Sequence, residues 1–91
     1  MCFVFWNKAV FNQTKRKLHS GHLLYTQLYL PSGIWTIALE FSIPPSEQGY
    51  ESMADKVYFP IDGAPHGLLA DGFEFDFFDG KTKIGKCVIT R

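Results

Sequence analysis

The run from Ile34 to Ile43, IWTIALEFSI, constrains the fold more than any other stretch of the chain. Apolar side chains occupy every second position, with small or polar residues between them. Alternate side chains of a strand point to opposite faces, so the run predicts a half-buried β-strand. The Pro44–Pro45 pair ends it, because proline has no N–H to donate to a neighbouring strand. The predicted inward residues are Trp35, Ile37, Leu39, Phe41 and Ile43.

The same alternation recurs over residues 72–79, GFEFDFFD, where Phe78 breaks an otherwise regular pattern. We expect Phe73, Phe75 and Phe77 to point inward and the acidic residues to point into water. The following DGKT sequence has the residues of a hairpin turn. A last strand is predicted over 83–90, in which Gly85 indicates a bulge or a tight bend.

Three further segments complete the predicted sheet. Residues 2–11 are rich in aromatic and β-branched side chains, and a strand over 56–61 has Pro60 near its end, as at a sheet edge or bulge. Residues 22–30 allow a short helix, but their length and flanking breakers favour a strand. We therefore predict an all-β, small closed antiparallel six-stranded β-barrel with little or no helix, formed by residues 1–91 as one domain. The longer loops, 12–20, 44–54 and 62–71, are the expected places for function.

The charges are segregated along the chain although they sum to zero. Residues 1–39 hold four basic residues and no acid, residues 40–79 hold all nine acids and one lysine, and residues 80–91 hold four basic residues. Pairing of oppositely charged strands on the outer face is the simpler interpretation, and a bipolar functional surface is the alternative. A net charge of zero provides no overall field to attract nucleic acid or a membrane surface.

Cys2 and Cys87 lack the spacing of a zinc site. Buried free thiols in a reducing cytosol are favoured, although a disulfide is conceivable if the first and last strands are neighbours. We expect a cytoplasmic protein, because we find neither a signal peptide nor a run of membrane-spanning length.

The best candidate for a phosphate or partner site is a basic loop, and its alternative is an ordinary solvated loop. Exposed aromatic residues are candidate anchors for a partner protein, with packing as the alternative. The candidate residues are Lys15, Arg16, Lys17, His19 and His22 in the loop, and Tyr25, Tyr29 and Phe78 among the aromatics.

Nothing in the chain predicts catalysis. Glu74 and Asp76 point outward into water, where their proton affinity is not adjusted for proton transfer, and His66 has no nucleophile in a recognisable context. The chain also lacks the Gly-x-x-x-x-Gly-Lys-Ser/Thr loop of nucleotide hydrolases. We expect no enzyme activity, no cofactor, no metal and no bound nucleotide.

The C-terminal part of the chain resembles the end of the third domain of elongation factor Tu, which is a six-stranded antiparallel barrel. The resemblance follows the order of a Met-Pro-Gly-Asp-x-Val segment, a Gly-Leu-Arg-Phe strand, a Gly turn and a closing Val-Gly-x-Gly-Val-Val strand. It covers about the last 40 residues well, and Gly21 and Gln27 extend it upstream. The matching residues are Met53, Asp55, Val57, Gly72, Phe73, Phe75, Asp79, Gly80, Ile84, Gly85, Val88 and Ile89.

In that family the domain grips the T stem of aminoacyl-tRNA, contacts the exchange factor and packs on the GTPase domain. Glu74 and Thr82 stand where the family has arginines, and Ala54 replaces a glycine. An acid repels phosphate, so inherited tRNA binding is disfavoured. The resemblance implies a free-standing, bacterial-type module that binds an unidentified protein without catalysis. The alternatives are an RNA- or tRNA-contacting accessory protein that uses loop 15–22, and an immunity or antitoxin-like protein that binds through its acidic face.

Overall fold

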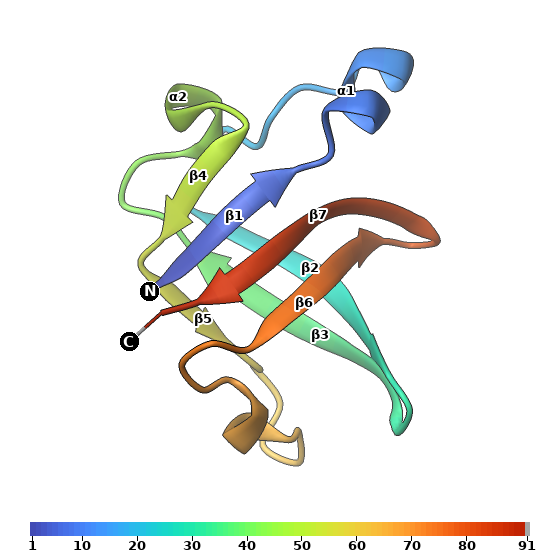
Figure 1. The fold of residues 1–91 in the computed structure, drawn as a ribbon, viewed down its shortest axis with the longest axis vertical. Coiled ribbons are helices and arrows are strands. Elements are labelled where there is room, and N and C mark those ends of the chain that lie inside the picture. Colours follow the sequence, from blue (N-terminus) through green and yellow to red (C-terminus); the bar gives the residue numbers. More distant parts are fainter. Residues whose placement is uncertain (91) are drawn as a thin grey trace.

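The computed structural model describes residues 1–90 and shows a nearly closed antiparallel β-barrel (Figure 1). The sheet order is β4-β1-β7-β6-β2-β3-β5, and all neighbouring strands are antiparallel. The predicted fold class is confirmed, with seven strands in residues 1–90 where six were expected. The strands are β1 (Cys2–Trp6), β2 (Leu23–Leu30), β3 (Gly33–Glu40), β4 (Glu51–Ala54), β5 (Lys56–Tyr58), β6 (Glu74–Asp79) and β7 (Thr82–Ile89).

The extra strand comes from a bend that brings the two ends of the sheet together. β4 pairs with β1 and β5 pairs with β3, yet only Asp55 separates β4 from β5 in the chain. The Asp55 N–H donates to the Glu40 carbonyl at 2.8 Å, and the Asp55 carboxylate accepts the Ser42 N–H at 2.5 Å. Residues 51–58 thus behave as one bent strand that contributes to both ends of the sheet.

Helix α1 (Lys8–Thr14) corrects the prediction of a first strand over residues 2–11. β1 ends at Trp6, which is the last position where β7 pairs with it. With no ladder to continue, the chain turns into a helix. Phe11 reaches the core from this helix, and its ring lies edge to face with that of Trp6, with 5.8 Å between the ring centroids. None of the helices in residues 1–90 is long and apolar enough to cross a membrane.

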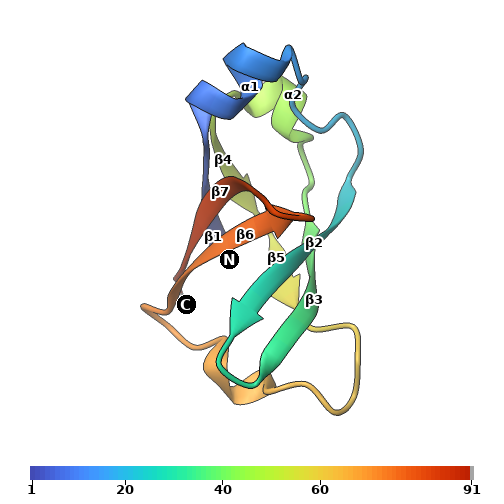
Figure 2. The same cartoon turned by 90° about the vertical axis from the view of Figure 1, so that its right-hand side faces the viewer.

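The prediction of a loop over residues 44–54 is also wrong, because this segment contains helix α2 (Pro45–Gln48) and β4. Proline suits the first turn of a helix, where no N–H is needed. The Gln48 side chain binds both backbone groups of Met53, accepting its N–H at 2.7 Å and donating to its carbonyl at 3.0 Å. Helices α1 and α2 lie at one end of the barrel, and the 3-10 helix η1 (His66–Leu68) lies at the other (Figure 2).

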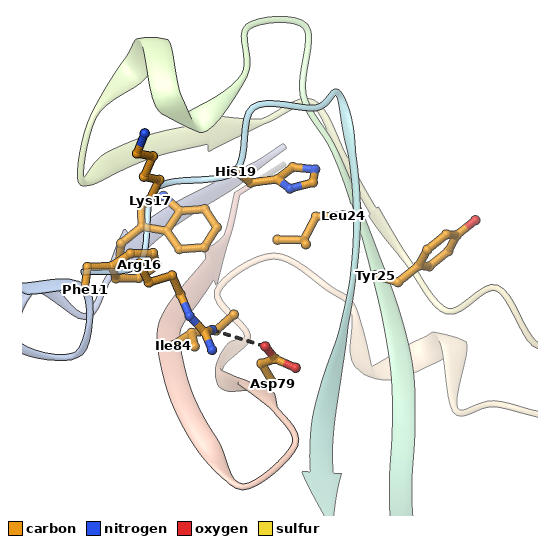
Figure 3. Close-up of a pocket in the computed structure, with 9 residues that line it drawn as sticks. Phe11, Arg16, Lys17, His19, Leu24, Tyr25, Asp79 and Ile84 are labelled. Atoms are coloured by element: carbon orange, nitrogen blue, oxygen red, sulfur yellow. Dashed lines mark ion pairs between the residues drawn. The ribbon is translucent and has the colours of Figure 1, made fainter. Parts of the chain in front are cut away.

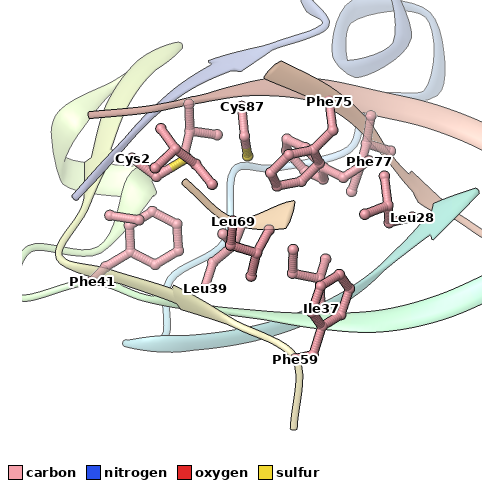
Figure 4. Close-up of a cluster of buried hydrophobic side chains, with 14 of the residues drawn as sticks. Cys2, Leu28, Ile37, Leu39, Phe41, Phe59, Leu69, Phe75, Phe77 and Cys87 are labelled. Atoms are coloured by element: carbon pink, nitrogen blue, oxygen red, sulfur yellow. The ribbon is translucent and has the colours of Figure 1, made fainter. Parts of the chain in front are cut away.

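The core fills the space between the strands (Figure 4). From β3, Ile37 and Leu39 are fully buried, as the alternation predicts, but Ile43 is 56% exposed because the strand ends at Glu40. Phe77 from β6 is fully buried and lies over Gly85 of β7, where an added Cβ would come within 2.5 Å of its ring. This glycine therefore leaves the space that the Phe77 ring fills.

A register shift on β7 agrees with the bulge expected near Gly85. Phe77 pairs with Gly85 and Phe78 pairs with Lys83, so Ile84 is the extra residue of β7. A bulge of this kind bends its strand and increases the local twist. The shift coincides with Phe78, the residue that breaks the alternation in the sequence.

The outer face of the β6–β7 hairpin pairs opposite charges, which supports the simpler interpretation of the segregated charges. The Lys86 Nζ lies 2.8 Å from the Glu74 carboxylate, and the Lys83 Nζ lies 3.2 Å from the Asp76 carboxylate. Inside the barrel, Cys2 and Cys87 are buried free thiols on the neighbouring strands β1 and β7. Burial raises the pKa of Cys87 well above its ordinary value.

Candidate binding hollow

The barrel wall has its shortest ladder where β2 meets β6. These strands pair at one position, Gln27 with Phe78, whereas β2 pairs with β3 along its whole length. Side chains reinforce the junction: the Thr26 hydroxyl donates to the Phe78 carbonyl at 2.6 Å, and the Gln27 side-chain oxygen accepts the Gly80 N–H at 2.8 Å. The Tyr29 hydroxyl donates to the Gly80 carbonyl at 2.5 Å. We call this junction the β2–β6 seam.

A hollow of about 370 Å³ lies beside the seam, between loop 15–22, the first half of β2 and the β6–β7 hairpin (Figure 3). Its volume falls in the lower part of the range for small-ligand sites. The lining residues are Trp6, Phe11, Arg16, Lys17, His19, Leu24, Tyr25, Asp79 and Ile84.

The hollow has an apolar floor and a charged rim. The floor consists of the buried Trp6, Phe11 and Ile84 with the half-buried Leu24. The rim carries exposed Arg16, Lys17 and Asp79, and the Arg16 guanidinium lies 3.2 Å from the Asp79 carboxylate. Both side chains of this ion pair are well exposed, so water and salt weaken the attraction between them. With two cations against one carboxylate, the rim is positively charged.

His19 holds loop 15–22 against β2. Its Nε2 lies 2.8 Å from the Leu23 carbonyl, and its own carbonyl accepts the Ser46 N–H at 2.9 Å. Gly21 packs against the imidazole, because a Cβ there would lie 2.9 Å from Nε2. The loop is therefore attached to both β2 and α2, and the basic residues before His19 are presented at the rim.

Four of the eight residues that the sequence proposed as a site line this hollow: Arg16, Lys17, His19 and Tyr25. The Tyr25 ring is 58% exposed and points away from the other lining residues in Figure 3, so its main chain is the part nearer to them.

The other four proposed residues lie elsewhere. Lys15 is exposed and follows α1 in the left-handed conformation, with φ 53°. His22 Nδ1 lies 2.8 Å from the Phe41 carbonyl, in a shallow depression beside the Asp55 bend. Tyr29 and Phe78 contact each other edge to face in the seam, with 4.6 Å between their ring centroids. Both rings therefore serve packing, which was the alternative to a role as partner anchors.

The sequence did not indicate the floor, because Phe11 was assigned to a strand, and it did not indicate Asp79 at the rim, because that residue was assigned to a turn. One signal was present: the alternation stops after Trp6, and Ala9, Val10 and Phe11 are consecutive apolar residues, which suits a helix better than a half-buried strand. The position of Asp79 beside Arg16 has no signal in the local sequence.

Tyr58 and Asp55 are two of the groups with shifted pKa values, and both lie outside the lining of the hollow. The hydrogen bond from the Tyr58 hydroxyl to Glu40, at 2.6 Å, raises the pKa of Tyr58. Hydrogen bonding to Ser42 lowers the pKa of Asp55. Within residues 1–90, no cluster of three or more His, Cys, Asp or Glu side chains is placed to hold a metal ion.

The fold and the hollow define a small antiparallel barrel with a positively charged depression in its wall. Comparison of the chain with protein-family models, with curated proteins and with solved structures found no match.

Proposed function

We propose that this protein is a non-catalytic binding module that takes an acidic segment of a partner protein in the hollow. The observation that carries the proposal is the combination of an apolar floor with the cationic rim of Arg16 and Lys17. Apolar contact supplies most of the affinity in such sites, and a few charged groups select the ligand and fix its orientation.

The availability of aromatic rings favours a protein partner over RNA. Proteins that bind single strands stack bases on exposed aromatic rings along a basic groove. Trp6 and Phe11 are 6% and 4% exposed, and Tyr29 packs against Phe78 and hydrogen-bonds to the hairpin. Tyr25 is exposed but points away from the other lining residues (Figure 3). An RNA-contacting role through loop 15–22 remains the second candidate because of the basic residues in that loop.

The idea of an immunity or antitoxin-like protein has less support, since it requires an acidic face that attracts its partner. Glu74 and Asp76 on β6 are already paired with Lys86 and Lys83. We also propose that the protein is related to the third domain of elongation factor Tu, that it comes from a bacterium and that it is cytoplasmic. The antiparallel barrel and the order of sequence motifs are the observations that favour the kinship.

The test is a selection of random 12-residue peptides displayed on phage against the full chain, followed by calorimetry of the selected peptides. We expect peptides that mix apolar residues with Asp and Glu, and at least a tenfold loss of affinity in the double variant Arg16→Ala, Lys17→Ala. The matched control is Lys56→Ala, Lys81→Ala, which removes the same charge away from the hollow.

The result that would overturn the proposal is equal binding by the two double variants, or no selected peptide at all.

The RNA alternative is tested with a 12-residue oligouridylate at low and moderate salt. Tight binding that falls steeply with salt and disappears when Lys15, Arg16 and Lys17 are replaced by Ala would favour RNA over an acidic peptide.

A further inference from the structure

The first half of β2 presents a strand edge to the hollow. Leu30 and Gly33 flank a two-residue turn, so their backbone groups bond to each other across the β2–β3 hairpin. Backbone groups alternate sides along a strand, and the N–H and C=O groups of Leu23, Tyr25 and Gln27 therefore face away from β3. Gln27 uses this side to pair with Phe78 of β6.

Within residues 1–90 no strand pairs with this edge of β2 before Gln27. β6 ends at Asp79 and turns into the hairpin, so it does not continue beside Tyr25. The His19 ring contacts the Leu23 carbonyl from this side at 2.8 Å, which confirms the direction in which the edge faces. Tyr25 lines the hollow although its ring points away from the other lining residues (Figure 3). This agrees with a β2 backbone edge that faces the hollow.

We propose that the occupant of the hollow is an extended acidic peptide that adds to β2 as a short strand, opposite Leu23–Tyr25, where β6 would lie if it continued. This inference rests on the proposed function and specifies the form of the partner. A strand edge supplies main-chain hydrogen bonds, and the pockets beside it select alternate side chains. His19 already contacts the Leu23 carbonyl, so the peptide pairs with the Leu23 N–H and with the N–H and C=O groups of Tyr25. The rest of the segment contacts the floor and the rim.

The charges and the burial of the lining specify the side chains of that peptide. Successive side chains of an added strand point to opposite faces, so one set enters the hollow and the other remains at its mouth. Inward side chains meet Phe11, Leu24 and Ile84 and are apolar, whereas side chains at the mouth meet Arg16 and Lys17 and are acidic. The peptide thus alternates apolar and acidic residues.

Asp79 competes with the peptide for Arg16. Its carboxylate lies 3.2 Å from the guanidinium and repels an incoming acid. We expect Asp79→Asn to raise the affinity for an acidic peptide about threefold. The same substitution at Asp62, which is exposed and does not line the hollow, is the control and leaves the affinity unchanged.

The experiment titrates the full chain with acetyl-Val-Glu-Val-Glu-Val-Glu-Val-amide by calorimetry. Two further versions carry backbone N-methyl groups. One is methylated at all three glutamates, and the other at every valine except the first. In a strand only every second N–H faces the neighbour. We expect one methylated version to lose at least tenfold in affinity and the other to lose less than threefold.

Equal affinities for the three peptides would overturn strand addition while leaving an acidic site in the hollow intact. Equal losses for both methylated versions would also overturn it, since side-chain docking has no reason to distinguish alternate N–H groups. Binding of the parent peptide that is unchanged by Arg16→Ala, Lys17→Ala would overturn the proposed function itself. Absence of binding by the parent peptide at 1 mM would overturn strand addition by an alternating acidic segment.

Discussion

The barrel closes its wall by different means at two junctions. At the β1–β7 junction the ladder holds five paired positions, from Cys2 with Ile89 to Trp6 with Gly85. At the β2–β6 seam the ladder holds one, and the side chains of Thr26, Gln27 and Tyr29 bind the β6–β7 hairpin. The first junction relies on backbone pairing and core packing, and the second on side-chain hydrogen bonds.

The difference shows where the molecule has room for a ligand. A full ladder leaves no backbone groups for a partner, and a core close to native packing density leaves no space for one. The seam begins at Thr26, and the hollow lies beside the part of β2 that precedes it, at Leu24 and Tyr25. The candidate site is therefore found where the wall has the fewest strand pairs.

The strongest test of the β1–β7 junction is Gly85→Ala. An added Cβ would lie 2.5 Å from the Phe77 ring and 2.8 Å from the Phe5 carbonyl, and Phe77 is fully buried. Overpacking of this kind lowers the free energy of unfolding by about 3 kcal/mol. Urea unfolding followed by tryptophan fluorescence measures the change.

Gly63→Ala is the matched control, because a Cβ at Gly63 has no atom within 4 Å. It adds the same methyl group without a contact, and we expect a change within about 0.5 kcal/mol. Similar losses for both variants would show that the contact between Phe77 and Gly85 does not limit stability.

Thr26→Val tests the seam and has the next largest effect. Thr26 is 5% exposed, and its hydroxyl donates to the Phe78 carbonyl at 2.6 Å. Loss of a largely buried hydrogen bond, with its acceptor left behind, lowers the free energy of unfolding by about 1.5 kcal/mol. Since 1 kcal/mol corresponds to roughly 4–8 °C in a domain of this size, calorimetry will detect the change.

The control for Thr26→Val is Thr82→Val at an exposed position of β7. Faster amide hydrogen exchange at Phe78 and Gly80 in Thr26→Val alone would locate the loss at the seam. Unchanged exchange there would assign the hydroxyl no role in closing the wall.

Tyr29→Phe removes a more exposed bond of the same seam. The ring keeps its edge-to-face contact with Phe78, and only the bond to the Gly80 carbonyl is lost. We expect a decrease of about 0.5–1 kcal/mol in the free energy of unfolding, in line with a solvent-accessible hydrogen bond. Tyr25→Phe, at an exposed tyrosine of the same strand, should change stability less, and the reverse order would contradict the assignment.

The sequence was sufficient to predict the class of fold, because alternation reports which strand residues face a core. Leu39 and Phe77 illustrate this, since both were expected to point inward and both are buried. The length of β1 was not predictable in the same way. It depends on where β7 stops pairing with it, and that end follows from the arrangement of distant strands.

The candidate site was predictable in part. The basic loop is visible in the sequence, and three of its residues, Arg16, Lys17 and His19, line the hollow. The apolar floor was missed because Phe11 reaches the hollow only through a helix that the sequence analysis did not predict. Asp79 and Arg16 are 63 positions apart in the chain, and their contact depends on the finished barrel.

The bend at Asp55 is a third way of closing the wall, and pH tests it. The Asp55 carboxylate accepts the Ser42 N–H, and this hydrogen bonding lowers the pKa of Asp55 below its ordinary value of 3.8. A lowered pKa in the folded state adds stability above pH 3.8, and that stability is lost as the pH falls through the folded-state pKa. Asp55→Asn should therefore be less stable than the native chain at pH 6, and the difference should shrink below about pH 4.

Because Asp55 is exposed, screening by water and salt keeps this effect the smallest of the four. Thermal unfolding of both proteins between pH 3 and pH 7 gives the difference directly, with Asp62→Asn as an exposed carboxylate in a loop for comparison. A constant difference between native chain and Asp55→Asn across this range would mean that the bend is held by the backbone bond from Asp55 to Glu40 and not by the carboxylate. The junction at Asp55 would then resemble the β1–β7 junction, where backbone pairing is sufficient, more closely than the seam.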